Sequence, residues 1–310
     1  SAGSGRLATA SVASSAHGCG PWRRSEPSTS DQPLLAVTIA PLVQRAADWI
    51  SQAESLLITA GAGMGVDSGL PDFRGEQGFW KHYPVLGKRN LSFIDIAQPK
   101  HFFSNPELAW GFYGHRLQLY RQAEPHAGFQ LLRKWGEQCV HGAFVYTTNV
   151  DGQFQKAGFS ANQIVERHGS IHHLQCSAPC NHHIWSAAGL EPIVDTARCK
   201  LLSPVPYCSE CGCVVRPNIL MFQDMGWLES RTDLQLLQLE RWLERVPDPL
   251  LIEIGAGKSG ATARNLGRKH GGRLIRINPD EQVFGDEHLL QLPLGALAGL
   301  TAIDAVLAAS

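Results

Sequence analysis

The segment LLITAGAGMGVDSGLPDFRG (residues 56–75) decides the fold. Leu56–Ala60 is a short apolar run typical of a buried strand, and glycines follow it at once at Gly61, Gly63 and Gly65. Glycines let a backbone approach a phosphate closely, and a helix that begins there offers free N–H groups and a partial positive charge. The segment therefore predicts a strand–loop–helix unit that suits a dinucleotide, although a glycine turn of this kind is also ordinary packing.

Three further apolar runs have the same character and lie at residues 143–147, 250–254 and 274–277. Helical stretches lie between them, and apolar strands that alternate with helices are typical of a parallel sheet covered on both faces. Small or polar residues follow the last two runs, and the carboxyl ends of parallel strands meet at one edge of a sheet. We therefore expect an α/β fold, a Rossmann-like sheet with a ligand lying across that edge.

The charge balance excludes some classes of protein. The chain has 310 residues with 27 Lys+Arg and 28 Asp+Glu, a formal net charge of −1. Direct binding of nucleic acid or of an anionic membrane surface needs a basic excess, which this chain lacks. No apolar run approaches the roughly 18 residues of a membrane span. We expect a cytoplasmic monomer whose partners include neither a membrane nor a nucleic acid.

Residues 1–36 are rich in Ser, Ala and Gly and show no hydrophobic period. Such a segment buries too little surface to offset its ordering entropy, so we expect a disordered tail before a first helix near 38–53. Three arginines in the tail, Arg6, Arg23 and Arg24, faintly resemble an organelle transit peptide. A plain tail is the simpler interpretation, with organelle targeting as the alternative to the cytoplasm.

Five of the eight cysteines lie in one Cys/His/Pro-rich segment, residues 170–216, which interrupts the pattern of strands and helices. They form two pairs, Cys176 with Cys180 and Cys208 with Cys211, and leave Cys213 as a surplus candidate. Four thiolates on two short turns suit the closed tetrahedral site of a structural zinc ion, which leaves no open position for catalysis. Reduced cysteines without metal, or disulfides, are the alternatives. The segment predicts an inserted zinc-binding module.

Two polar segments lie near the middle of the chain, Thr147–Asp151 after an apolar run and Glu166–Gly169 before the apparent strand 171–176. A turn at a strand end favours Asn and Asp for conformational reasons alone, and a lone His is more often structural than catalytic. Here the ring of His168 can point into a cleft, and His is the side chain most easily tuned to act as a base near neutral pH. His168 and Asn149 are therefore the candidate catalytic residues.

A helix is expected to begin within Ser104–Leu108, which offers a polar cap, Pro at the first position and an early Glu. Tyr113 and Arg116 lie three residues apart and share a face of this helix. A Tyr hydroxyl beside a guanidinium receives a carboxylate well, because Arg binds carboxylates through two parallel charge-assisted hydrogen bonds. The alternative is a surface Arg on an amphipathic helix with the Tyr packed inward.

The motif GAGMGVDSGLPDFRG resembles the cofactor-loop signature of the sirtuins, the NAD-dependent protein deacylases, whose usual form is GAGxSxxSGIPDFR. TTNVD (147–151) is similar to the family's TQNID, and ERHG (166–169) to its E-x-HG. Sirtuins also carry a four-Cys zinc module at this place, before the RPxI strand, here residues 216–219. The resemblance runs in the right motif order from about residue 40 to about 300, so it covers nearly the whole folded chain.

The resemblance implies an enzyme that takes NAD and an acyl-lysine protein or peptide and releases nicotinamide, lysine and O-acyl-ADP-ribose. It implies that His168 deprotonates a ribose hydroxyl, Asn149 orients the ribose and a water, and Asp151 holds the nicotinamide amide. The implied cofactor-binding residues are Gly61, Ala62, Gly63, Gly65, Asp72, Phe73, Arg74, Thr148, Asn149, Asp151, Gly255, Ala256 and Asn278. The implied substrate-binding residues are Tyr113, Arg116, Met221 and Phe222, and the implied ligands of a structural Zn²⁺ are Cys176, Cys180, Cys208 and Cys211.

Several motifs depart from the usual family pattern, and each departure touches the cofactor or substrate cleft. Thr148 replaces the Gln of TQN, Gly65 the Ser of GAGxS, and Gln153-Phe154 the usual Leu-His; FQD (222–224) replaces FGE, and GAG (255–257) replaces GTS. They leave a mono-ADP-ribosyltransferase, or an NAD-hydrolysing or NAD-binding protein, as the alternative functions. Retention of His168 favours deacylation, because transfer to another acceptor does not need that base.

The string W-x-F-Y-x-x-R (110–116) is similar to the one in desuccinylase-type sirtuins, where Tyr and Arg read a negatively charged acyl chain. The resemblance therefore adds malonyl-, succinyl- or glutaryl-lysine to acetyl-lysine as the expected substrate. We expect a Rossmann-like domain from residues 37–169 and 217–310. A smaller domain would come from two insertions, one helical (about 75–125) and one zinc-bearing (170–216), with NAD and the acyl-lysine in the cleft between the domains.

Overall fold

The four apolar runs form strands with the predicted bounds. They are β1 (Leu56–Ala60), β2 (Ala143–Thr147), β9 (Leu250–Ile254) and β10 (Leu274–Ile277). Three short strands that the sequence patterns do not single out complete the sheet: β3 (Ile164–Glu166), β11 (Phe284–Gly285) and β12 (Leu289–Leu292). The computed structural model describes residues 31–71, 75–246, 248–257, 266 and 272–309. Seven strands in the order β11-β12-β10-β9-β1-β2-β3 make one sheet, parallel throughout except between β11 and β12.

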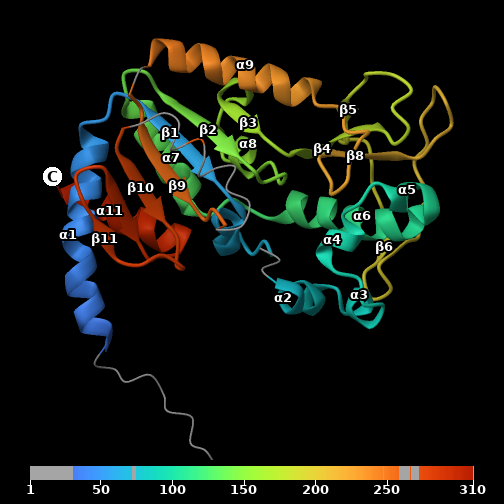
Figure 1. Cartoon of the computed structure of the whole chain (residues 1–310), viewed down its shortest axis with the longest axis horizontal. Helices are drawn as coiled ribbons and strands as arrows, with labels where there is room; N and C mark the ends of the chain where they lie inside the picture. Colours follow the sequence, from blue (N-terminus) through green and yellow to red (C-terminus); the bar gives the residue numbers. More distant parts are fainter. Residues whose placement is uncertain (1–30, 72–74, 247, 258–265, 267–271, 310) are drawn as a thin grey trace, which may run out of the picture. The chain divides into compact units, whose positions relative to one another are not determined.

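Alternate residues of the central strands enter separate cores on the two faces of this sheet. In β1, Leu56 and Ile58 pack with α1 (Asp31–Ser51), α7 (Ala127–Gln138) and α11 (Ala296–Ala309). Leu57 packs on the opposite face with α9 (Ser230–Arg245), the long helix at the top of Figure 1. Strands buried on both faces need the near-continuous apolar sequence that these runs have. The predicted α/β sheet with helices on both faces is confirmed.

The two predicted insertions contribute to one further core. The helical insertion comprises α2 (Gly75–His82), α3 (Pro84–Lys88), α4 (Phe93–Ile96), α5 (Lys100–Ser104) and α6 (Pro106–Gln122). The cysteine-bearing segment adds a three-stranded sheet of β4 (Gly169–Cys176), β5 (Trp185–Ser186) and β8 (Val215–Ile219), and a hairpin of β6 (Val194–Asp195) and β7 (Lys200–Leu201). Buried residues of both insertions belong to the same hydrophobic cluster.

The helix α6 joins the two insertions directly. It begins as predicted, with Pro106 at its first position and the side chain of Asn105 accepting a hydrogen bond from the N–H of Leu108 at 3.1 Å. The indole Nε1 of buried Trp110 donates to the carbonyl of Val215 at 2.8 Å. A Cβ at Gly111 would lie 2.3 Å from the carbonyl oxygen of Cys199, so only a glycine lets the helix pack this closely there.

Three short helical elements fill the connections: η1 (Ala62–Ser68), α8 (Gln153–Lys156) and η2 (Ala161–Gln163). The element after the glycine loop is therefore a seven-residue 3₁₀ helix, which ends at Gly69 with φ +79°. It is shorter and tighter than the α-helix that the strand–loop–helix reading suggests. Among the described residues, no helix combines the length and apolarity that crossing a bilayer requires.

The first helix begins earlier than the sequence predicts. We expect it near 38–53, after a tail of residues 1–36, whereas α1 spans Asp31–Ser51. Pro33 falls in the first turn of the helix, where a missing backbone N–H costs no hydrogen bond, so the helix tolerates it. Residues 31–36 therefore belong to α1 and not to the tail, and residues 1–30 lie outside the described residues. Residues Thr38–Ser310 form one compact unit.

Candidate active site

The loops after β1 and β9 meet at the point where the strand order reverses. These two strands are neighbours, and the chain leaves β1 toward β2 on one side and enters β9 on the other. The N–H of Gly61 donates to the carbonyl of Ile254 at 3.0 Å, and the N–H of Gly63 donates to the carbonyl of Gly255 at 3.1 Å. In open α/β sheets, ligands bind outside the carboxyl ends of the strands at such a reversal.

Glycines at this junction are required by the packing of the two loops. A Cβ at Gly61 would lie 2.7 Å from the carbonyl oxygen of Gly255, and a Cβ at Gly255 would lie 2.4 Å from the backbone nitrogen of Met64. Gly255 also has φ +60°, in the left-handed region. The packing interpretation of the glycine loop thus accounts for these two glycines directly, and it shapes the edge on which a dinucleotide would lie.

A cavity of about 460 Å³ opens beside this junction. Nine predicted site residues line it: Ala62, Tyr113, Arg116, Thr148, Asn149, Asp151, His168, Met221 and Phe222. They come from five separate parts of the sequence, namely the glycine loop, α6, the loop after β2, the residue before β4, and the segment after β8. The structure therefore brings the predicted catalytic residues and the predicted acyl-reading pair to one cavity.

The loop after β2 holds its polar side chains through backbone contacts. The N–H of Asn149 donates to the Thr147 hydroxyl at 3.0 Å, and the Asn149 amide nitrogen donates to the carbonyl of Gly61 at 3.0 Å. Asp151 accepts from the N–H of Gln153 at 3.0 Å, which closes an Asx turn. The turn therefore explains Asn149 and Asp151 in conformational terms. The same two residues also line the cavity.

Asp151 is a buried carboxyl group. Burial raises the pKa of Asp151 to about 6, and the hydrogen bond from Gln153 and the nearby positive charge of Arg116 oppose that shift. A buried carboxyl of this kind is a good acceptor for an amide N–H₂. A Cβ at Gly65 would lie 3.1 Å from Leu70 and 3.7 Å from the Asp151 carboxylate, so a larger residue at this position would crowd Leu70 beside the carboxyl group.

His168 lies at the cavity between β3 and β4. Burial lowers its pKa, and the positive charge of neighbouring Arg167 lowers it further, against a hydrogen bond with the backbone of Thr148. A His with a lowered pKa is neutral at pH 7 and is therefore able to accept a proton. Glu166, just before it, is buried and forms an ion pair with Arg231 of α9, which fixes the end of β3 beside His168.

Arg116 is buried among aromatic rings at the cavity. Its Cζ lies 5.3 Å from the ring centroids of both Phe112 and Tyr120 and 5.7 Å from that of Tyr113. Its Nε and Nη2 atoms donate to the Tyr120 hydroxyl at 3.1 and 2.7 Å. The surface-arginine alternative is therefore wrong, because Arg116 is only 6% exposed. Tyr120, which also lines the cavity, is a residue that the sequence analysis misses.

The segment after β8 forms another wall of the cavity. Buried Arg216 donates from Nη1 to the carboxylate of Asp224 at 3.0 Å, and neither side chain is accessible to solvent. Asp224 also accepts from the N–H of Met221 at 3.2 Å. The ion pair thus anchors the turn that presents Met221 and Phe222. Within that turn, exposed Gln223 adopts φ +55°, a conformation that L residues rarely take.

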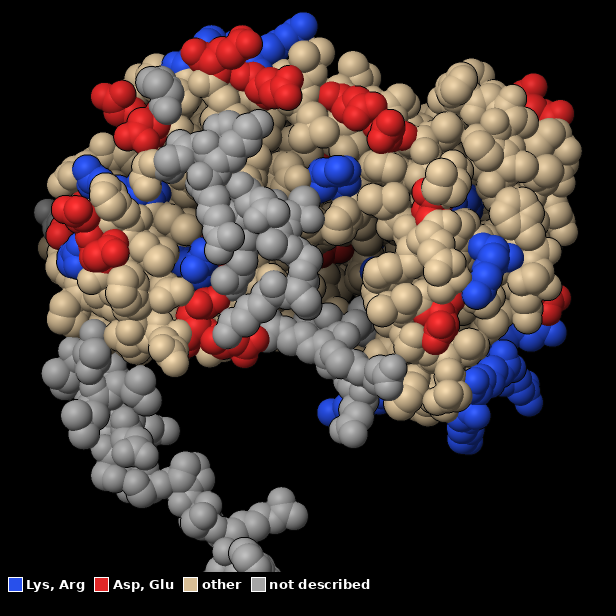
Figure 2. Space-filling view, viewed as in Figure 1, with Lys and Arg blue, Asp and Glu red and all other residues tan. Residues whose placement is uncertain are grey.

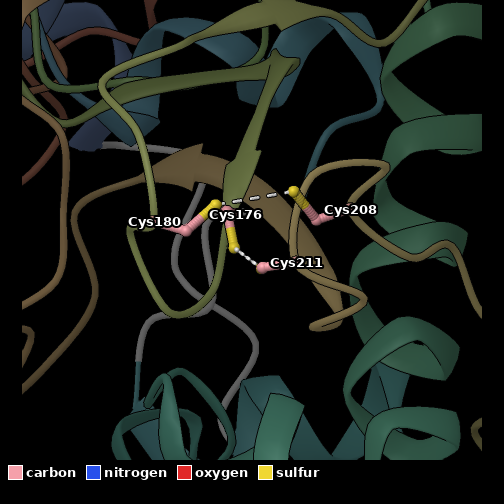
Figure 3. Close-up of side chains that lie close together, drawn as sticks. All are labelled: Cys176, Cys180, Cys208 and Cys211. Carbon is pink, nitrogen blue, oxygen red and sulfur yellow. Dashed lines mark hydrogen bonds between the residues drawn. The ribbon is translucent and has the colours of Figure 1, made fainter.

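The four predicted zinc ligands lie together (Figure 3). The sulfur atoms of Cys176, Cys180, Cys208 and Cys211 all lie within 4.8 Å of one another. Cys176 and Cys211 are 3.5 Å apart at sulfur, and Cys180 and Cys208 are 3.7 Å apart. Zn–S bonds of about 2.3 Å in a tetrahedron place sulfurs about 3.8 Å apart, so the four thiols fit zinc and no open position remains. Cys213 is not a member of this four-cysteine group.

Other predicted residues lie elsewhere. The side chain of Asn278 is buried, donates to the carbonyl of Ala256 at 2.8 Å and accepts from the N–H of Asp280 at 3.1 Å. It therefore braces the loop after β9, and its contact with a cofactor stays a prediction, as do those of Gly63 and Ala256. Asp72, Phe73 and Arg74 lie outside the described residues.

Comparison with known proteins identifies the family. The model of the Sir2 family matches residues 61–237, more than half of the chain, and the chain therefore belongs to the Sir2 family. The NAD-dependent protein deacylase of Aquifex aeolicus (strain VF5) is 27% identical over 232 residues, which cover 73% of this chain and 84% of that protein. The NAD-dependent protein deacetylase of Halalkalibacterium halodurans is 29% identical over 236 residues, covering 75% of this chain and 86% of that protein.

A solved structure of a Sir2 homologue in complex with NAD is similar to this chain in fold. Its TM-score is 0.65 at 25% identity, and the match covers 86% of this chain and 94% of that one. The resemblance to the sirtuins that the sequence motifs indicate is thus confirmed at the level of the family and of the fold.

Proposed function

We propose that this chain is an NAD-dependent protein-lysine deacylase that releases nicotinamide and forms O-acyl-ADP-ribose. The observation that carries the proposal is the gathering of Asn149, Asp151 and His168 at one cavity, beside the junction of the glycine loop with the loop after β9. The names of the relatives, NAD-dependent protein deacylase and deacetylase, and the NAD complex of the solved homologue support it.

The residues present fit the nicotinamide–ribose end of NAD. Asp151 offers a buried carboxyl acceptor for a carboxamide, and Asn149 and His168 offer polar groups for a ribose on the same cavity. Bound NAD supplies an electrophilic ribose carbon and nicotinamide as the leaving group. Three residues of the cavity would act on bound NAD. Asp151 would orient the carboxamide, Asn149 would orient the ribose, and neutral His168 would accept a ribose hydroxyl proton at a ring nitrogen.

The four-cysteine cluster fits a structural role for zinc. It connects the end of β4 with the loop before β8. Only short strands and loops lie between these two segments, so the metal would hold together a region that has no long helix. Bound Zn²⁺ would be held by four thiolates, which offers no open coordination position for a reacting group. The chemistry therefore belongs to NAD and the cavity residues.

We further propose that the enzyme prefers an acidic acyl group, such as succinyl- or malonyl-lysine. Buried Arg116 and Tyr113 line the same cavity as His168, and Arg binds a carboxylate with charge-assisted hydrogen bonds. Burial raises the pKa of Tyr113 to about 12, so its hydroxyl keeps its proton at neutral pH. The opposing charge of Asp151 on the same cavity makes a neutral acyl group such as acetyl the competing substrate.

One experiment separates deacylation from the alternative functions. The full chain is incubated with NAD and with acetyl-, succinyl- or malonyl-lysine peptide, and the products are identified by mass spectrometry. Free lysine with O-acyl-ADP-ribose supports the deacylase. A gain of ADP-ribose mass on protein supports a mono-ADP-ribosyltransferase, and release of nicotinamide without peptide supports an NAD hydrolase. If His168→Ala keeps full peptide-dependent turnover, the proposed role of the base is wrong.

The acyl preference has its own test. A charged hydrogen bond is worth about 1.5–3 kcal/mol, so Arg116→Met is expected to lower kcat/KM for the succinyl peptide by about tenfold or more. The acetyl peptide should change by less than about threefold, since it makes no such bond. Arg198→Met is the matched control, because Arg198 lies on the exposed hairpin loop away from the cavity. An unchanged succinyl-to-acetyl ratio in Arg116→Met contradicts the acidic-acyl proposal.

A further inference from the structure

Tyr120 lies beside Arg116 on α6 and bonds to its guanidinium. It lies four residues after Arg116 on α6, so the two side chains are neighbours on one helix face. Its hydroxyl oxygen accepts from Nε of Arg116 at 3.1 Å and from Nη2 at 2.7 Å. Both residues are buried, and both line the cavity.

These two bonds fix the plane of the guanidinium. An arginine side chain loses conformational entropy when a ligand orders it. A guanidinium that is already held in place loses less on binding. The rings of Phe112 and Tyr120 also pack against the same group, each with its centroid 5.3 Å from the Arg116 Cζ. Tyr120 therefore sets the direction from which a carboxylate meets Arg116.

The same two bonds leave the hydroxyl proton of Tyr120 as a donor. A phenol oxygen has two acceptor lone pairs and one O–H donor, and here both lone pairs face N–H groups of Arg116. Burial raises the pKa of Tyr120, so the hydroxyl stays protonated at neutral pH. Among the described residues, no acceptor takes this proton, whereas an acyl carboxylate in the cavity would be such an acceptor.

A directed donor matters here because the cavity already contains a carboxyl group. The positive charge of Arg116 acts on Asp151 and lowers its pKa against the effect of burial. One guanidinium therefore faces two carboxyl groups once an acidic acyl chain enters. Because Asp151 already offsets part of the charge of Arg116, that charge alone distinguishes an acidic acyl chain from a neutral one only weakly. A short O–H···O⁻ hydrogen bond from Tyr120 would strengthen the preference for the acidic chain.

Gln153 holds the end of α6 that carries Tyr120. This buried amide stands where the family usually has Leu, and its Nε2 donates to the carbonyls of Tyr120 and Ala123, each at 3.4 Å. Its backbone N–H donates to the carboxylate of Asp151 at 3.0 Å. The loop that would hold the nicotinamide and the helix that would read the acyl chain are thus joined through one residue.

We propose that Tyr120 is a specificity-determining residue for the acyl group. It fixes the guanidinium of Arg116 and donates its hydroxyl proton to the terminal carboxylate of an acidic acyl-lysine. This inference rests on the proposed deacylase function and on its acidic-acyl preference.

The test is Tyr120→Phe, which removes the hydroxyl and keeps the buried ring. kcat and KM are measured with succinyl-lysine and acetyl-lysine peptides of the same sequence. The loss of one charge-assisted hydrogen bond is expected to raise KM for the succinyl peptide about tenfold, with kcat and both acetyl constants within about twofold. Tyr207→Phe is the control, since it also removes one tyrosine hydroxyl, but from an exposed residue that does not line the cavity.

Each outcome decides between the proposals. A rise in KM for both peptides, or for neither, overturns the role of Tyr120. If Arg116→Met abolishes the succinyl preference and Tyr120→Phe keeps it, the proposed role of Tyr120 is wrong and the acidic-acyl proposal stands. If the unaltered chain shows no succinyl preference, the acidic-acyl proposal fails and the inference fails with it. Both peptides are assayed on one preparation, so partial unfolding lowers both rates alike and leaves the ratio of KM values unchanged.

Discussion

The close approach of the loop after β9 to the glycine loop predicts that Gly255→Ala damages both stability and NAD binding. At this position φ is +60°, and an added Cβ would lie 2.4 Å from the nitrogen of Met64 and 2.5 Å from the carbonyl carbon of Gly63. Both contacts are with backbone atoms of the glycine loop, which cannot rotate away as a flexible side chain would. The substitution therefore forces the two loops apart.

The expected magnitude has two parts. A left-handed conformation costs an L residue about 1–2 kcal/mol relative to glycine. Forcing an extra methyl group into a packed site costs about 1–3 kcal/mol more. Gly255→Ala should therefore lower the free energy of unfolding by about 2–5 kcal/mol. Because the loops move apart at the edge where NAD would lie, KM for NAD should also rise about tenfold or more.

Gly142→Ala is the control that separates these two parts. Gly142 also has a left-handed φ of +70°, but a Cβ there would contact only the side-chain amide of Gln163, at 3.7 Å. It should show the conformational cost of about 1–2 kcal/mol and an unchanged KM for NAD. Urea unfolding and NAD titration of both variants measure these quantities. Equal losses of stability in the two variants, with KM for NAD unchanged in both, would refute the close-packing argument.

Three more predictions concern the base, the metal and the ion pair. Arg167→Gln should raise the pKa of His168; because the protonated form is inactive, the acid limb of the kcat/KM–pH profile should move to higher pH. Cys208→Ser, or treatment with a chelator, should remove zinc from the protein and abolish cooperative unfolding, whereas Cys213→Ser should keep about one zinc per chain by elemental analysis. Asp224→Asn leaves a buried guanidinium without its counter-charge and should cost about 3–5 kcal/mol in urea unfolding; a loss below about 1 kcal/mol would contradict the burial.

The central strands could be predicted residue for residue, and the reason is physical. Each is a five- or four-residue apolar run buried on both faces, so its sequence carries the whole signal. The strand β3 has only three residues, and β11 is exposed at the edge, so neither contains a comparable pattern. Short strands of this kind depend on their neighbours for pairing, and only the fold reveals the neighbours.

The candidate site divides in the same way. Asn149 and Asp151 share one motif of contiguous residues, and His168 stands in a second one. The resemblance to the sirtuins implies that both motifs serve one site. Tyr120 stands in no motif, and an aromatic residue on a mostly buried helix reads as ordinary core. Its significance comes from two hydrogen bonds to Arg116, which depend on side-chain geometry that a pattern of residue types does not contain.

The departure from FGE to FQD shows how a changed motif keeps its framework. The acid at the third position is retained as Asp224, which pairs with buried Arg216 and accepts from the N–H of Met221, so the turn at the cavity stays anchored. The middle position is conformationally strained, because Gln223 has φ +55°, a conformation in which a glycine would be unstrained. Gln223 itself is exposed, whereas the ion pair of Arg216 with Asp224 is buried. The substitution therefore alters the exposed surface beside the cavity, and it leaves in place the groups that are proposed to hold NAD and to move the proton.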